Sequence, residues 1–174
     1  MKLLTFAASS SSQSINKHLA TYAASLVTYA DIDVLDINDF EMPLYSSDRE
    51  NESGIPSLAQ EFLDRIAQAD AIIISFAEHN GSYTAAYKNL FDWASRINPK
   101  VYQNKPMVLL ATSPGPGGAN TVLTAAVNSA PYFAGNVKAS LSIPSFYDNF
   151  DVVTGKVTNA KLLTALIATV NSLT

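Results

Sequence analysis

AIIISFAEHNGSY, residues 71–83, is the stretch from which the fold of this chain can be worked out. Its first part, Ala71 to Ile74, is wholly apolar, which is typical of a strand buried on both faces. A short polar loop follows, and apolar residues then recur at helical spacing from about Thr84 to Ile97. Asn80-Gly81 permits a tight turn, because glycine tolerates positive φ and asparagine nearly so. Taken alone, Asn80-Gly81 favours an ordinary turn between a strand and a helix.

Four further segments have strand character, and helical patterns separate them. Leu3–Ala7 and Pro106–Ala111 are continuous apolar runs, which predicts central strands. Ile32–Ile37 and Val137–Ile143 alternate apolar with polar residues, which predicts the edges of a sheet. Residues 38–54 are polar and contain proline and glycine, so we expect a loop there. The predicted helices begin at about Ile15, Pro56, Thr84, Ala119 and Asn159.

Strands that alternate with helices predict an α/β fold with a parallel sheet. Right-handed crossovers, with the continuous strands central and the alternating ones at the edges, favour the strand order 2-1-3-4-5 with helices on both faces. The winding then reverses between the first and third strands, which opens a crevice at the carboxyl edge of the sheet. Because neither an internal repeat nor a domain boundary is visible, we expect a single domain over residues 1–174.

Three unusual loops follow the first, third and fourth strands, and this order brings them to the same crevice. Residues 8–14, ASSSSQS, precede a helix whose unpaired N–H groups and dipole favour an anion. A simple helix cap explains that segment equally well. Residues 112–118, TSPGPGG, let a backbone approach a ligand closely. Together with Asn80-Gly81, the three loops favour a phosphorylated, flat, polar ligand, and FMN fits this description.

Composition excludes several functions. The net charge of −4 argues against a nucleic-acid partner, and the lack of cysteine excludes disulfides and thiolate catalysis. The two histidines, His18 and His79, lie far apart in the sequence, so no metal site is expected. No apolar run is long enough to cross a membrane, and Met1–Ala8 suits a strand better than a signal peptide. We therefore expect a cytoplasmic protein.

The chain resembles the NAD(P)H-dependent FMN reductases of the flavodoxin-like superfamily, which include azoreductase, quinone reductase and chromate reductase types. Residues 77–83, AEHNGSY, followed by 88–93, KNLFDW, look like the signature P-E-Y-N-G-S…K-N…D-W of that family. Residues 9–16 look like its phosphate loop G-S-x-R-x-x-S-x-N, and residues 113–118 like its third flavin loop. The resemblance implies a flavodoxin-like three-layer sandwich. Ser11 stands where the family has arginine.

The resemblance also implies a set of cofactor-binding residues. The FMN phosphate would be held by Ser9, Ser11, Gln13, Ser14, Ile15 and Asn16. The edge of the isoalloxazine ring would be contacted by Glu78, His79, Asn80, Gly81 and Ser82, and its other side by Ser113, Gly115, Gly117 and Gly118. The flavin carries the chemistry, so no catalytic side chain is expected. His79 is the one candidate proton donor, and an orienting role is favoured for it.

The implied reaction passes a hydride from NADH or NADPH through FMN to a small acceptor such as a quinone or an azo compound. The alternative is a flavodoxin-type electron carrier, which binds FMN without turning over a substrate; such carriers are usually far more acidic than this chain. A scaffold that has lost its flavin is a third interpretation, and Ser11 in place of the family arginine is the observation that favours it.

The helix at 84–97 has more apolar residues than one face can hold. We therefore expect a second subunit to pack on this helix, and the resemblance implies a homodimer or homotetramer assembled through it. The other interpretation is that the segment 98–104 folds back and covers the additional apolar residues.

Overall fold

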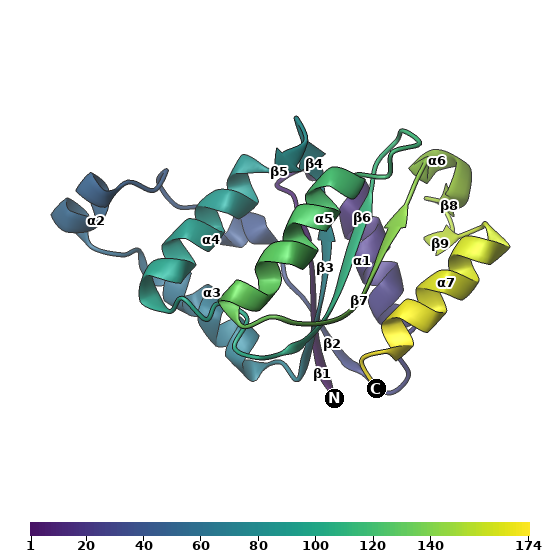
Figure 1. The fold of residues 1–174 in the computed structure, drawn as a ribbon, viewed down its shortest axis with the longest axis horizontal. Helices are drawn as coiled ribbons and strands as arrows, with labels where there is room; N and C mark the ends of the chain where they lie inside the picture. Colours follow the sequence, from purple (N-terminus) through teal and green to yellow (C-terminus); the bar gives the residue numbers. More distant parts are fainter.

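A five-stranded parallel sheet forms the centre of the protein, with helices on both faces (Figure 1). The computed structural model describes residues 1–174. The strands are β1 (Lys2–Ala8), β2 (Asp31–Val34), β3 (Ala71–Phe76), β6 (Pro106–Thr112) and β7 (Asn136–Ile143). Their order is β2-β1-β3-β6-β7, and every neighbouring pair is parallel. Because β6 and β7 are the fourth and fifth strands of this sheet along the chain, the predicted order 2-1-3-4-5 is confirmed.

The helices divide between the two faces of the sheet. Those that pack on one face are α3 (Ser57–Gln68), α4 (Ala85–Ile97) and α5 (Asn120–Ser129); those on the other are α1 (Ile15–Ser25) and α7 (Ala160–Asn171). The remaining helical elements are η1 (Ile37–Phe40), α2 (Ser47–Ser53), η2 (Ala130–Phe133) and α6 (Phe146–Asn149). Two short antiparallel hairpins pair β4 (Glu78–His79) with β5 (Ser82–Tyr83) and β8 (Phe150–Asp151) with β9 (Lys156–Val157).

The central strand β3 contributes to both hydrophobic cores, because successive residues of a strand point to opposite faces. Ile72, Ile74 and Phe76 belong to the core under α3, α4 and α5, whereas Ala71 and Ile73 belong to the core under α1 and α7. All six residues of β3 are buried, while all four residues of β2 are exposed. The continuous apolar runs are therefore central strands and the alternating ones edges, as the patterns predict.

The prediction of a loop at 38–54 is wrong, because this segment contains most of η1 and all of α2. Polar side chains start both elements: Asp36 accepts a hydrogen bond from the N–H of Asn38, and Ser46 from that of Arg49. Helix α2 has no buried residue, so it has no apolar periodicity by which it could be recognised. It projects away from the sheet at the side of the molecule (Figure 1).

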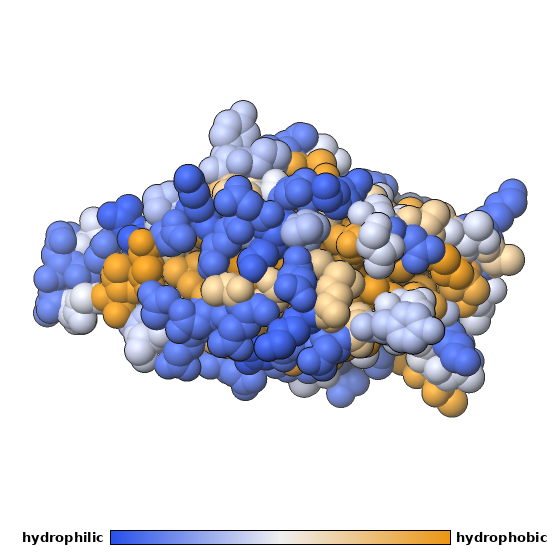
Figure 2. Space-filling view, turned by 90° about the horizontal axis from the view of Figure 1, so that it is seen from below, coloured by the Kyte–Doolittle hydropathy of each residue, from blue (hydrophilic) through white to orange (hydrophobic).

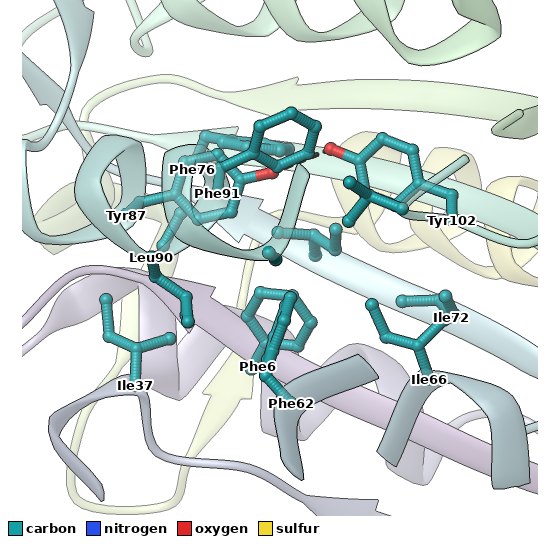
Figure 3. Packing of buried hydrophobic residues seen from close by; sticks show 14 of the residues in the cluster. Phe6, Ile37, Phe62, Ile66, Ile72, Phe76, Tyr87, Leu90, Phe91 and Tyr102 are labelled. Carbon is teal, nitrogen blue, oxygen red and sulfur yellow. Dashed lines mark hydrogen bonds between the residues drawn. The ribbon is translucent and has the colours of Figure 1, made fainter. Parts of the chain in front are cut away.

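The additional apolar residues of α4 are covered by the chain itself. Trp93 is buried, its indole Nε1 donates to the carbonyl of Pro43 at 2.7 Å, and Tyr45 packs edge-on against its ring. On the other side, Tyr102 is buried and its ring lies 5.6 Å from that of Phe91 (Figure 3). The segment that includes Tyr102 does fold back over the helix, so the expectation of an oligomer now depends on the family resemblance alone.

The lower end of the molecule, where the strands begin, presents mainly hydrophilic residues with apolar residues scattered among them (Figure 2). None of the helices combines the length and the apolarity that crossing a lipid bilayer requires.

A buried amide ties the carboxyl ends of the strands together. Asn16 is 2% exposed, and its Oδ1 accepts hydrogen bonds from the hydroxyl of Ser75 at 2.7 Å and from the N–H of Thr112 at 3.1 Å. Its Nδ2 donates to the carbonyl of Thr112 at 3.2 Å. The side chain of Thr84 makes a similar link, donating to the carbonyl of Ala8 at 3.0 Å. These bonds join the starts of α1 and α4 to the ends of β1, β3 and β6.

We expect Asn16→Ala to lower the free energy of unfolding by about 2–4 kcal/mol, because it leaves buried polar groups of Ser75 and Thr112 without partners. Urea denaturation followed by circular dichroism measures this loss. Asn128→Ala is the matched control: Asn128 is exposed on α5, so its replacement should change stability by no more than about 0.5 kcal/mol. Equal losses in the two variants would contradict the structural role of Asn16.

Candidate functional site

A polar hollow of about 270 Å³ lies at the carboxyl edge of the sheet, and loops far apart in the sequence meet there. The lining residues are Ser9, Ser11, Gln13, Ser14, Ile15, Asn16, Ala77, Glu78, His79, Thr112, Ser113, Pro114 and Tyr147. The hollow lies over β1 and β3, where the winding of the chain reverses, and that is the usual position of a ligand in such sheets. All three loops singled out in the sequence therefore contribute to one site.

The serine loop presents hydroxyl groups whose protons are free. Ser9 Oγ accepts from the N–H of Ser11 at 3.3 Å, Ser11 Oγ from that of Gln13 at 3.2 Å, and Ser14 Oγ from that of Lys17 at 3.2 Å. These bonds hold the loop in its shape. None of the three hydroxyls donates to a protein acceptor, so each proton can be donated to a ligand.

The first turn of α1 adds two backbone donors. The N–H groups of Ile15 and Asn16 have no acceptor within the chain, as expected at the start of a helix. With the helix dipole, these donors favour an anion at this end of the hollow. The side chain of Asn16 does not take part, because all its hydrogen bonds go to the strand ends. Asn16 was predicted to bind the phosphate, and only its backbone N–H group is available for that role.

No lysine or arginine lines the hollow. Lys17 is the nearest cation in sequence, but its Nζ lies 2.6 Å from Asp36 Oδ2, on the side of a different cavity. Its ammonium group, together with the N–H of Asn38, lowers the pKa of the Asp36 carboxyl. Ser11, which takes the place of the family arginine, supplies a hydroxyl where a charge would stand. An anion in this hollow therefore meets neutral donors only.

The second loop is a hairpin that the sequence did not reveal. Asn80 and Gly81 have φ angles of 52° and 74°, and both positive values fit the two-residue turn that joins β4 to β5. Glu78 and His79 line the hollow, whereas Asn80, Gly81 and Ser82 are exposed at the tip of the hairpin. The carboxylate of Glu78 accepts a hydrogen bond from the N–H of Val122 at 2.8 Å, in the first turn of α5. This bond fixes the hairpin against the neighbouring helix.

The third loop lines the hollow through Ser113 and Pro114, while its glycines shape the loop behind them. Gly118 has a φ of 58°, and a Cβ placed there would overlap Ser142 Oγ and lie 3.1 Å from Pro144 Cα. Gly115 accepts a hydrogen bond from the N–H of Ser145. The predicted residues Gly115, Gly117 and Gly118 are thus not among the lining residues.

Reasoning from the sequence missed Ala77, Thr112, Pro114 and Tyr147 as lining residues. Tyr147 is the most informative of these, since it comes from α6 and its side chain is 64% exposed at the rim. The N–H of Phe146 donates to the carbonyl of Ser113 at 3.0 Å, which ties α6 to the third loop. The sequence feature that could have pointed to Tyr147 is an aromatic residue directly after the last strand of the sheet, because that strand ends at the same edge as the hollow.

The order of the sheet defines a doubly wound α/β protein, and the hollow lies where proteins of this class bind their ligands. The family model described as "NADPH-dependent FMN reductase" matches residues 1–148, and the chain belongs to this family. FMN and the nicotinamide donor are thus the cofactors of its family.

Several known proteins are similar to this chain. A quinone reductase of Escherichia coli (strain K12) is 33% identical over 107 residues, which cover 56% of this chain and 57% of the relative. A 2-hydroxy-1,4-benzoquinone reductase of a Burkholderia species is 37% identical over 117 residues, which cover 66% of this chain and 62% of that protein. The chain therefore matches only a little over half the length of these curated relatives.

A solved structure of FerB, a flavoenzyme NAD(P)H:(acceptor) oxidoreductase from Paracoccus denitrificans, superposes with a TM-score of 0.77 and covers 99% of this chain and 94% of that one. At 24% identity, this similarity shows the fold, which is flavodoxin-like as predicted.

We expect Gly118→Ala to lower the free energy of unfolding by about 1–3 kcal/mol, because the new methyl group meets Ser142 and the positive φ disfavours alanine. Gly117→Ala is the control, since a Cβ there meets no atom within 4 Å and its φ is not positive. Thermal unfolding of the two variants checks the difference. A Gly118→Ala protein as stable as Gly117→Ala would contradict the close approach of this loop to β7.

Proposed function

We propose that the chain binds FMN in the polar hollow and acts as an NAD(P)H-dependent oxidoreductase that reduces small quinones. The observation that carries this proposal is the meeting of the three loops around one hollow with free hydroxyl and N–H donors at a helix start. Membership of the FMN reductase family supports the cofactor. The names of the two relatives, both of them quinone reductases, support the class of acceptor.

The residues present suit such a cofactor. The phosphate would be held by the N–H groups of Ile15 and Asn16 and by the hydroxyls of Ser9, Ser11 and Ser14, which together surround an anion with donors. The flat ring would lie between the hairpin residues Glu78 and His79 and the segment at Ser113 and Pro114. Gln13 would complete the phosphate end, and Asn80, Gly81, Ser82, Gly115, Gly117 and Gly118 would act by shaping the two ring-binding loops.

The chemistry supplied by FMN is the acceptance of a hydride from a nicotinamide and its delivery to an acceptor. The chain itself contributes binding and orientation. Its backbone donors hold the charged end in place, and the hairpin, fixed by Glu78 to α5, keeps one wall of the hollow rigid. His79 is exposed, and because the flavin would carry the chemistry, no side chain has to act as an acid or a base. Tyr147 would form an exposed aromatic edge beside the acceptor.

The test begins with the visible absorbance of the protein purified with added FMN. The loaded protein is then mixed without oxygen with NADH or NADPH, and afterwards with a benzoquinone or an azo dye. We expect FMN retention, bleaching by a nicotinamide and rapid reoxidation by the quinone. Failure to retain FMN would refute the proposal. Retention without any steady-state oxidation of NAD(P)H would favour the flavodoxin-type electron carrier instead.

Assembly into a homodimer or homotetramer through α4 and a cytoplasmic location stay predictions from the sequence. Sedimentation velocity measures the first. A monomer at all concentrations would remove the proposal of an interface on α4.

We expect Ser11→Arg to tighten FMN binding by about tenfold, because it brings a guanidinium group to a phosphate otherwise held by neutral donors. Quenching of flavin fluorescence on titration gives the dissociation constant. Ser12→Arg is the matched control: Ser12 is the next residue but lines a different cavity, so it should change the constant much less. Equal tightening in both variants would indicate a general charge effect and contradict a phosphate at Ser11.

A further inference from the structure

A second cavity lies on the other side of the β4–β5 hairpin, between α4 and α5, and it shares no residue with the polar hollow. It has a volume of about 240 Å³, and five aromatic side chains make most of its lining. The lining residues are Tyr83, Tyr87, Lys88, Phe91, Asp92, Ser95, Tyr102, Ser129 and Phe133.

The aromatic walls of this cavity support one another. The rings of Tyr83 and Tyr87 have centroids 5.5 Å apart, those of Tyr87 and Phe91 5.9 Å, and Phe133 meets Phe91 edge-on at 4.7 Å. Figure 3 shows Tyr87, Phe91 and Tyr102 converging in the core beside Phe76. Rings that are packed in this way keep their positions when a ligand enters, so the cavity is pre-formed. Binding to a pre-formed cavity costs little conformational entropy, because few side chains have to become ordered.

One hydroxyl proton in the wall has no acceptor. The hydroxyls of Tyr87 and Tyr102 lie 2.6 Å apart (Figure 3), and the two side chains are 3% and 5% exposed. The pair has two protons, and the single hydrogen bond between the two oxygens uses only one of them. Neither hydroxyl makes another hydrogen bond, so one buried O–H group is free to donate. Burial raises the pKa of both tyrosines, which keeps both hydroxyls protonated at neutral pH.

The other polar groups of the lining are already paired. The hydroxyl of Tyr83 lies 3.0 Å from that of Ser129, which also bonds to the helix backbone. Ser95 donates to the carbonyl of Asp92, and the carboxylate of Asp92 forms an ion pair with Lys88. The free hydroxyl proton of the tyrosine pair is therefore the group of this cavity that a ligand would satisfy.

We propose that this cavity is a second small-molecule site, which binds a neutral one- or two-ring aromatic ketone whose carbonyl oxygen accepts the free tyrosine proton. The volume of the cavity agrees with a ligand of one or two rings, because an apolar cavity of roughly 150 Å³ already holds benzene. Aromatic walls with a few polar groups are the usual composition of small-molecule sites. The lone buried donor selects a ligand with one acceptor, and the aromatic walls disfavour an ionised one.

The experiment uses the full chain with FMN in excess and two probes that differ only in the carbonyl, 1-indanone and indane. Binding is followed by amide chemical shifts. We expect 1-indanone to bind with a dissociation constant on the order of 0.1–1 mM, with shifts at Tyr83, Tyr102 and Ser129. Indane should bind roughly three- to tenfold more weakly, since it lacks the acceptor.

The double variant Tyr87→Phe, Tyr102→Phe removes both hydroxyls together, so no donor is left unpaired. It should bind 1-indanone as weakly as indane, while indane binding stays unchanged and reports an intact cavity. Ser95→Phe fills the cavity and should abolish both. Its control is Ser25→Phe on α1, where the serine makes the same kind of bond to a carbonyl three residues earlier.

Equal affinity of the wild-type protein for the two probes would overturn the proposal. So would 1-indanone binding that is seen in a parallel titration without FMN but is lost with FMN in excess, since that would place the probe in the polar hollow. Failure of both probes to bind, together with a concentration-dependent dimer that Ser95→Phe disrupts, would show that a second copy occupies the cavity and would also overturn it. These outcomes are independent of whether the protein oxidises NAD(P)H.

Discussion

The buried amide of Asn16 is the interaction on which the rest of the structure depends. In a parallel sheet, the ends of neighbouring strands are joined to their helices by separate loops, and nothing in the backbone pairing holds those loops together beyond the last ladder bond. The side chain of Asn16 reaches from the first helix to the ends of β3 and β6. Because it makes three hydrogen bonds out of contact with water, it fixes the distance between the serine loop and the other two loops.

That constraint explains how the site that we propose, with no charged lining at the end assigned to the phosphate, can still be specific. The hydroxyls of Ser9, Ser11 and Ser14 each accept a bond from a backbone N–H group, and none of them donates to a protein acceptor. A family arginine would supply attraction at long range, whereas hydroxyl and N–H donors act only at contact. In the site that we propose, shape and preorganisation therefore carry the recognition, and both come from the fixed framework beneath the loops.

The sheet and its order could be predicted because they depend on patterns of burial that the sequence displays directly. The continuous apolar run from Ala71 to Ile74 predicts a strand buried on both faces, whereas the alternating residues of Ile32–Ile37 predict a strand with one exposed face. The convergence of the three loops followed from the order of the strands alone. Helix α2, by contrast, buries nothing, so its formation depends on the Ser46 cap and on local propensity.

Other features depend on contacts between segments distant in the sequence. The sequence shows an asparagine at position 16, but it does not show whether its amide faces a ligand or the strand ends. Only the folded structure decides between these two roles. Tyr147 reaches the rim because α6 is tied to Ser113. The apolar residues of α4 suggested a partner subunit. Periodicity shows that more than one face of the helix is apolar, but it does not show which segment of the same chain covers these faces. Tyr45 and Tyr102 cover them here.

The lack of a cation beside the serine loop has a consequence for how long the proposed enzyme would keep its flavin. A dianion held without any opposing charge leaves at a rate set by a few short-range bonds, and its release needs no ion pair to be broken. In a protein that works as we propose, the fraction carrying flavin follows the supply of free FMN, and bound and released cofactor exchange within the working life of each molecule. Activity would then rise and fall with flavin synthesis, without any separate regulator.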